Sequence, residues 1–176
     1  MMRWMAPGLL ALLLLLPPPA AAAVLVGEVV GVTDGDTIRV LDADKRQHRV
    51  RLTGIDTPER RQDWYQRARQ ALAGLVHRKV VEVRWDKKDR WGRILGKVLI
   101  ADPACAEDCA RTWDVNLALV RDGHAWWFRR YAHEQTAADR KLYEQAEERA
   151  RAAKIGLWSL PDPVPPWDFR RKKRRK

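Results

Sequence analysis

Three short segments of the sequence bring together the residue types that phosphodiester hydrolysis needs. They are Asp34-Gly35-Asp36-Thr37, Arg51-Leu52-Thr53-Gly54-Ile55-Asp56-Thr57-Pro58-Glu59 and Asp89-Arg90-Trp91-Gly92-Arg93. Carboxylates can gather a hard cation, and a further carboxylate can take a proton from water. Arginine grips two phosphate oxygens with a charge that does not titrate away. Two aspartates, one glutamate and two arginines therefore indicate a metal-assisted phosphodiesterase.

Each of these residues also has an ordinary explanation when it is taken alone. Asp34-Gly35 is a common turn, and Asp56-Thr57-Pro58 is a common strand ending. Arg51 fits an exposed strand position, Arg93 fits a charge that flanks a turn, and Glu59 fits a carboxylate at the start of a helix. The catalytic interpretation depends on their occurring together and in this order.

The hydrophobic pattern predicts five strands to carry these segments. Residues 26–33 and 37–41 flank the Asp-Gly pair as a hairpin, and residues 48–55 alternate between apolar and polar. A fourth strand covers 81–85, and a turn at 87–92 leads to a fifth that ends near 100. Asp36 then begins a strand, and Asp56 lies where Pro58 bends the third strand out of its ladder. Both aspartates can face the same mouth of a barrel.

Three helices complete the pattern. The first lies between the third and fourth strands, because its apolar residues recur on one helix face: Trp64, Ala68, Ala71, Leu72, Leu75 and Val76. A short helix is predicted over 114–121, with Asp114 as cap and Gly123 as terminator. A longer one covers about 133–154. This order predicts a mixed α+β, mainly β fold, a five-stranded OB-fold barrel with three helices.

With these motifs in order, the chain resembles the staphylococcal-type thermonuclease family from about Val26 to Trp158. The resemblance implies that Asp36, Asp56 and the backbone carbonyl of Thr57 hold Ca²⁺. It implies that Glu59 is the general base, and that Arg51 and Arg93 bind the phosphate and stabilise its transition state. The implied reaction is calcium-dependent endonucleolytic hydrolysis of DNA and RNA at the 5′ oxygen, which leaves 3′ phosphates.

The residues expected to contact the nucleic acid match the family less closely. They are Asp89, Arg90, Trp91 and Tyr131. The founding members have a lysine and a tyrosine where this chain has Arg90 and Trp91, and Arg129 stands where a second tyrosine aligns. Trp91 can still stack on a base and Arg90 can still meet a phosphate. Trp126-Trp127-Phe128 is predicted to belong to the core, and the four histidines show no ligand spacing.

The two ends of the chain are predicted to differ from the domain between them. Residues 1–23 have the pattern of a secretory signal peptide, with Arg3, an apolar block and small residues up to Ala23. A retained membrane anchor is the alternative, although three consecutive prolines interrupt the apolar run. Residues 24–160 then form the nuclease domain. Residues 161–176 are predicted to be a Pro-rich linker and a disordered polybasic tail.

Charge is concentrated in that tail. The chain of 176 residues has a formal net charge of +11, and its last seven residues are all basic. Such a run can neutralise phosphates along a polyanion. We therefore expect residues 170–176 to raise affinity for long nucleic acids without touching the chemistry.

Cys105 and Cys109 are the two cysteines of the chain, and they lie in a segment interrupted by Asp102-Pro103. In an exported protein such a pair favours a disulfide over two free thiols. A metal site is the alternative, but two thiolates do not complete a tetrahedral shell.

The sequence thus predicts a periplasmic or extracellular nuclease that acts on DNA and RNA as a monomer, with no obligate protein partner. Two alternatives stay open. One is a non-catalytic nucleic-acid-binding OB barrel, and the other is a membrane-anchored component that takes up or processes DNA.

Overall fold

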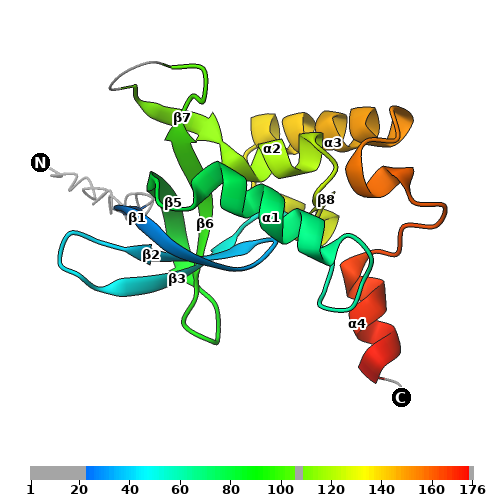
Figure 1. Ribbon diagram of the computed structural model, residues 1–176, viewed down its shortest axis with the longest axis horizontal. Helices are drawn as coiled ribbons and strands as arrows, with labels where there is room; N and C mark the ends of the chain where they lie inside the picture. The colour runs from blue at the N-terminus through cyan, green and yellow to red at the C-terminus, as the bar shows by residue number, and fades with distance from the viewer. Residues whose placement is uncertain (1–22, 106–108, 175–176) are drawn as a thin grey trace, which may run out of the picture.

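The structure, a computed structural model, describes residues 23–105 and 109–174 (Figure 1). All but the last residue of the predicted signal peptide lies outside these ranges. Within them, none of the helices is both long and apolar enough to cross a membrane.

Five strands form the barrel that the sequence predicts. They are β1 (Ala23–Asp34), β2 (Thr37–Leu41), β3 (Gln47–Leu52), β5 (Val80–Lys88) and β6 (Ile94–Ala101). The antiparallel order is β3-β2-β1-β5-β6, and a parallel pairing of β3 with β6 closes it. Alternating apolar residues fill the interior, among them Val40, Val50, Val83 and Val98, each with no exposed surface. The fold is the OB-type barrel of mixed α+β class.

Three helices cover one side of this barrel. α1 (Tyr65–Val76) buries Ala68, Leu72 and Val76, which lie on the face that the sequence predicts. α2 (Val115–Arg121) begins at its expected cap, since the Asp114 carboxylate accepts a hydrogen bond of 3.0 Å from the Leu117 amide. α3 (Ala137–Ala152) packs beside α2 (Figure 1).

The structure contains elements that the periodicity does not reveal. β7 (Arg111–Asp114) extends the sheet beyond β6, and β4 (Ile55–Asp56) forms a separate two-residue ladder with β8 (Trp126–Trp127). The predicted helix over 133–154 begins later, at Ala137, because a 3-10 turn η1 (Arg129–Glu134) comes first. A second 3-10 turn, η2 (Gly156–Ser159), follows α3. These short elements have too few residues to show a period.

The C-terminal segment differs most from its prediction. Instead of a disordered tail, residues up to 174 form the helix α4 (Pro166–Arg174), at the lower right of Figure 1. Pro166 is buried at its start, where proline is compatible with a first helical turn. Trp167 stacks on Phe128 with ring centroids 5.4 Å apart and meets Trp126 edge-on at 5.6 Å. This aromatic packing, which charge composition does not reveal, holds the helix against the domain.

A second hydrophobic cluster explains why α4 has a surface to bind. It lies outside the barrel and consists of Trp126, Ala150, Leu157 and Trp158, with Trp64 and Trp167 packed against it. Trp126 and Trp127 are 4 % and 6 % exposed, so the prediction that they belong to the core agrees with the structure. Phe128 is only partly buried and provides the docking face for α4.

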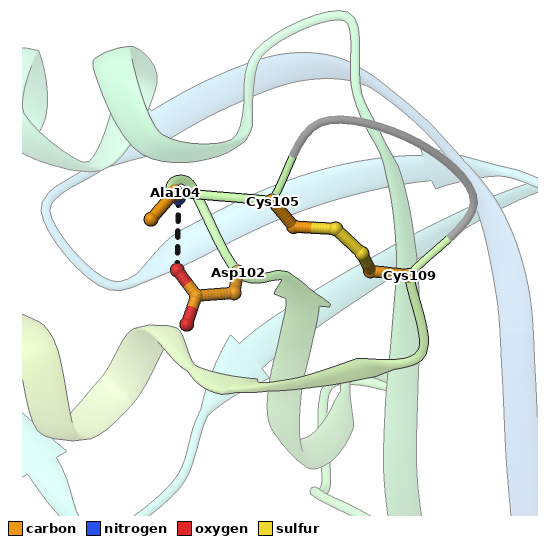
Figure 2. Close-up of a disulfide and its surroundings, with 4 residues drawn as sticks. All are labelled: Asp102, Ala104, Cys105 and Cys109. Carbon is orange, nitrogen blue, oxygen red and sulfur yellow. Dashed lines mark hydrogen bonds between the residues drawn. A yellow bond between two sulfur atoms is a disulfide. The ribbon is translucent and has the colours of Figure 1, made fainter.

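Cys105 and Cys109 form a disulfide in the loop between β6 and β7, with Cα atoms 6.4 Å apart (Figure 2). Beside them, the Asp102 carboxylate accepts a 2.8 Å hydrogen bond from the Ala104 amide. The bridge closes a very short ring, so the loss of chain entropy that it imposes on the unfolded state is small.

We therefore expect replacement of both cysteines by serine to lower the free energy of unfolding by at most about 2 kcal/mol. Urea denaturation of the double variant and of the parent protein measures this difference in unfolding free energy. The nuclease activity of the double variant should stay within twofold of the parent. A much larger loss of stability would show that the bridge supports the fold and not only its loop.

Candidate active site

Asp36 lies at the turn between β1 and β2, where the chain reverses at Gly35. A Cβ added to Gly35 would lie 2.7 Å from Oγ1 of Thr57, so only glycine permits this close approach of the two segments. The Asp36 carboxylate is buried, and it accepts hydrogen bonds from the Thr37 hydroxyl at 3.1 Å and the Thr57 hydroxyl at 3.0 Å. These contacts fix the carboxylate beside the segment that carries the second aspartate.

Asp56 is positioned by the short ladder between β4 and β8, where it pairs with Trp126. Its side chain is 1 % exposed. Burial is the main cause that raises the pKa of the Asp56 carboxyl, and the cations of Arg170 and Arg51 oppose that rise. The two aspartates, 20 positions apart in the sequence, thus meet at one mouth of the barrel as predicted.

Arg51 of β3 bridges the two aspartates. Its Nη2 donates to Oδ1 of Asp56 at 2.9 Å, and its Nη1 is in ion-pair contact with Asp36. Burial alone would lower the pKa of the Arg51 guanidinium, but the charges of Asp36 and Asp56 raise it, so Arg51 stays cationic. The guanidinium also lines a hollow at the barrel mouth, where a phosphate oxygen can bind it.

Asp34 adds a third acidic group at the same turn. Burial and the neighbouring Asp36 raise the pKa of its carboxyl to about 7. Its Oδ1 accepts a hydrogen bond of 3.2 Å from the Asp36 amide. Asp34 therefore shapes the turn and shares the electrostatic environment of the site.

Glu59 lies just beyond Pro58 and is 37 % exposed, so it can reach water that enters the site. Its amide donates to the side-chain oxygen of Gln62 at 2.7 Å, which holds the loop before α1. Its Oε1 accepts a hydrogen bond of 2.6 Å from Nη1 of Arg170 in α4. Sequence reasoning missed Arg170, because nothing in a basic run distinguishes the arginine that contacts Glu59 from its neighbours in the run.

Arg93 is held by the loop that precedes it. The Asp89 carboxylate accepts from the Arg93 side chain at 2.7 Å and from the amides of Trp91 and Arg93 at 2.9 and 3.0 Å. The guanidinium also lies 5.3 Å from the centre of the Trp91 ring. Asp89, predicted to contact nucleic acid, thus has its oxygens engaged in organising this loop. The Arg93 cation draws the pKa of Asp89 below its usual value, against the effect of partial burial.

All six residues predicted for catalysis and metal binding line one hollow of about 440 Å³. They are Asp36, Arg51, Asp56, Thr57, Glu59 and Arg93. Three separate segments of the sequence therefore converge as the chemistry requires. The hollow contains both acidic and cationic groups, a combination suited to binding a cation and a phosphate together.

A second, larger groove of about 680 Å³ adjoins this hollow, and Arg51 and Arg93 line both. The four residues predicted to contact nucleic acid, Asp89, Arg90, Trp91 and Tyr131, all line it. Trp91 is 57 % exposed and carries the Arg90 guanidinium 4.2 Å from its ring centre. From α4 come Trp167, Arg170, Arg171 and Arg174. The groove combines stacking faces with cations, which is typical of single-strand nucleic-acid binding.

Arg129, which stands where a tyrosine of the family aligns, contacts residues that hold the fold together. Its Nη1 donates at 2.5 Å to the fully buried Glu147, and its guanidinium lies 4.5 Å from the Trp127 ring centre. Because Glu147 also accepts from the Trp127 amide, Arg129 neutralises a buried carboxylate that secures β8 to α3.

Among residues 23–105 and 109–174, no group of three or more His, Cys, Asp or Glu side chains is arranged to hold a metal ion. Two buried carboxylates, Asp36 and Asp56, nevertheless face the same guanidinium, which shows that the position favours positive charge. Carboxylate and backbone carbonyl oxygens are the donors that Ca²⁺ accepts. Together with the carbonyl of Thr57, this oxygen donor set fits a hard cation.

Comparison with known proteins supports the same chemistry. Residues 49–160 match the family described as staphylococcal nuclease homologue. The chain is 46% identical over 147 residues to the Protein ParB of Escherichia coli, covering 84% of this chain and 80% of that protein. It is 41% identical over 145 residues to the micrococcal nuclease of Shigella flexneri, covering 82% and 80% of the two chains. An uncharacterized endonuclease of Escherichia coli is 40% identical over 147 residues, covering 84% and 86%.

The matched region contains the residues predicted to be catalytic in the second and third motifs, and the relatives align over most of both chains. The non-catalytic alternative is therefore set aside. The chain belongs to the staphylococcal nuclease homologue family and is a phosphodiesterase that hydrolyses nucleic acids.

Proposed function

We propose that the protein is an exported, calcium-dependent endonuclease that hydrolyses DNA and RNA at the 5′ oxygen and leaves 3′ phosphates. The observation that carries the proposal is the convergence of Asp36, Arg51, Asp56, Glu59 and Arg93 on one hollow. Export rests on the sequence pattern of residues 1–23 alone. The proposed substrates follow from the family resemblance and from the cationic groove.

The residues of the hollow divide the work of the reaction. Asp36, Asp56 and the Thr57 carbonyl would hold Ca²⁺, which supplies positive charge beside the phosphate. Glu59, the more exposed carboxylate, takes a proton from the attacking water. Arg51 and Arg93 offer the scissile phosphate their guanidinium groups, and Asp89 positions that of Arg93. Positive charge held in advance stabilises the extra negative charge of the transition state.

The decisive experiment measures hydrolysis of single-stranded DNA and of RNA with added calcium and then with excess chelator. A variant that combines Arg51→Ala with Glu59→Ala serves as the control. We expect activity with calcium, loss of activity with chelator, and no activity in the double variant at either condition. Equal activity with and without chelator would contradict the calcium proposal, and analysis of the product termini tests which oxygen leaves.

The exposed ring of Trp91 leads to a separate prediction about substrate affinity. We expect Trp91→Ala to weaken binding of single-stranded oligonucleotides by about 5- to 150-fold, because one stacked base contributes roughly 1–3 kcal/mol. Trp91→Tyr keeps a stacking face and should bind within threefold of the parent. Fluorescence anisotropy with a labelled oligonucleotide in chelator measures binding without cleavage. If both variants bind alike, the ring has no stacking role.

A further inference from the structure

Arg170 connects the C-terminal helix to the catalytic carboxylates. Its Nη2 donates to Oδ2 of Asp56 at 2.7 Å, and its Nη1 donates to Oδ1 of Asp56 at 3.2 Å and to Oε1 of Glu59 at 2.6 Å. One guanidinium thereby contacts both Asp56, which is proposed to bind the cation, and Glu59, which is proposed to take a proton from the attacking water. Arg170 and Asp56 are 114 positions apart in the sequence, so the contact depends on where α4 docks.

Asp56 has little acceptor capacity left once Arg170 is in place. Its Oδ1 accepts from both Arg51 and Arg170, and its Oδ2 accepts from Arg170. A carboxylate has about four lone-pair sites in total. The Asp56 side chain is 1 % exposed, so water reaches it poorly. A divalent cation that binds Asp56 must therefore compete with the Arg170 guanidinium for the same oxygens and for the same negative charge.

The helix that presents Arg170 is held by contacts independent of this ion pair. Pro166 is buried, and Trp167 stacks on Phe128 and meets Trp126 edge-on. The backbone of α4 can therefore stay in place while the long arginine side chain exchanges partners. The adjoining groove, which Arg170, Arg171 and Arg174 also line, is where a polynucleotide phosphate would offer the released guanidinium a new partner.

We propose that Arg170 is the resident counter-cation of Asp56 and Glu59 in the metal-free protein, and that it must release both carboxylates before the divalent cation binds. Arg170 is thus a positioning residue that controls the entry of the cation. It also replaces the expectation that residues 170–176 act without touching the chemistry, since this member of the run contacts the catalytic carboxylates. The inference rests on the proposed function, because it concerns the same cation site.

The experiment measures calcium affinity in the absence of nucleic acid, so that catalysis does not enter the readout. Calorimetric titration compares the purified parent with Arg170→Gln and with Lys172→Gln, which removes the same charge from an exposed position two residues further along α4. Removing one hydrogen-bonded charged competitor corresponds to about a tenfold change in affinity. We expect Arg170→Gln to bind calcium at least tenfold more tightly, and Lys172→Gln to stay within twofold of the parent.

Arg170→Lys tests whether positive charge at this position is the cause. Lysine keeps the charge but not the fork of donors, so its calcium dissociation constant should lie between those of the parent and Arg170→Gln. The proposal is overturned if Arg170→Gln binds calcium no more tightly than Lys172→Gln, or if Arg170→Lys matches Arg170→Gln. If Arg170→Gln binds calcium no more tightly than Lys172→Gln, the proposed calcium dependence still stands, because the parent binds the ion. If no variant binds calcium, both the role of Arg170 in controlling entry of the cation and the proposed calcium dependence are contradicted.

Discussion

Replacing Arg51 with alanine is expected to lower the rate of DNA hydrolysis by about 10²- to 10³-fold. Loss of one preorganised stabiliser of transition-state charge has an effect of this size. The structure gives Arg51 two roles, because its guanidinium is paired with both Asp56 and Asp36 and also lines the hollow proposed to hold the phosphate. The turnover number at saturating DNA should therefore fall more than the Michaelis constant rises.

The same substitution should destabilise the metal-free protein. The side chains of Asp36 and Asp56 are 7% and 1% exposed. Without Arg51, less positive charge compensates their two buried negative charges. Removing one partner of a buried ion pair costs about 3 kcal/mol or more of unfolding free energy. Urea denaturation in chelator measures the loss, and added calcium should restore part of it because the cation compensates the same carboxylates.

Two further variants separate these effects from a general loss of charge. Arg46→Ala removes an arginine from the exposed turn before β3, so its rate and stability should stay near those of the parent. Arg51→Lys keeps the charge but cannot bridge both aspartates, so it should recover stability better than rate. An Arg51→Ala enzyme with near-parent turnover would remove Arg51 from the mechanism.

The positions of the candidate catalytic residues were predictable from the sequence because their motifs are local. Asp36 follows a glycine turn, and Asp56 precedes the proline that redirects the strand, so each position follows from a few neighbouring residues. Strand alternation then places Arg51 on the polar face of β3, opposite the buried Val50 and Leu52. Local chemistry and strand periodicity together bring the three to one barrel mouth.

The role of α4 was not predictable in the same way. Its sequence carries few apolar residues and many like charges, which is typical of a solvated or disordered tail. Its docking depends on Trp167 meeting Phe128 and Trp126, which come from a different part of the chain. Such a long-range aromatic contact leaves no periodic signal. The prediction therefore failed where tertiary packing, and not composition, decides the structure.

Asp89 shows that local hydrogen bonds add a detail that the motif does not give. The family resemblance assigned it to the nucleic acid, and it does line the groove. Its carboxylate oxygens, however, accept hydrogen bonds from Trp91 and Arg93, which orders the loop that presents both residues. A motif identifies which residues belong to a site, but the hydrogen bonds within it determine which residue contacts the ligand and which one positions another.

Replacing Glu59 with glutamine tests the remaining chemical step. Glutamine has nearly the same size but cannot take a proton from water, and general bases contribute about 10²- to 10⁴-fold to a rate. We expect the turnover number to fall within that range while oligonucleotide affinity changes by less than threefold. Single-turnover cleavage at saturating enzyme isolates the chemical step from product release.

The matched control for that substitution is Glu144→Gln, the same chemical change at an exposed position of α3. It should leave the rate within twofold. Because Glu59 also accepts a hydrogen bond from Arg170, calcium affinity must be measured in parallel with the rate. If Glu59→Gln slows cleavage only at limiting calcium, and reaches the parent rate once calcium saturates, Glu59 serves the cation and not the attacking water. A deficit that persists at saturating calcium assigns the proton transfer to Glu59, since no other step in the proposed reaction requires that carboxylate to be ionised.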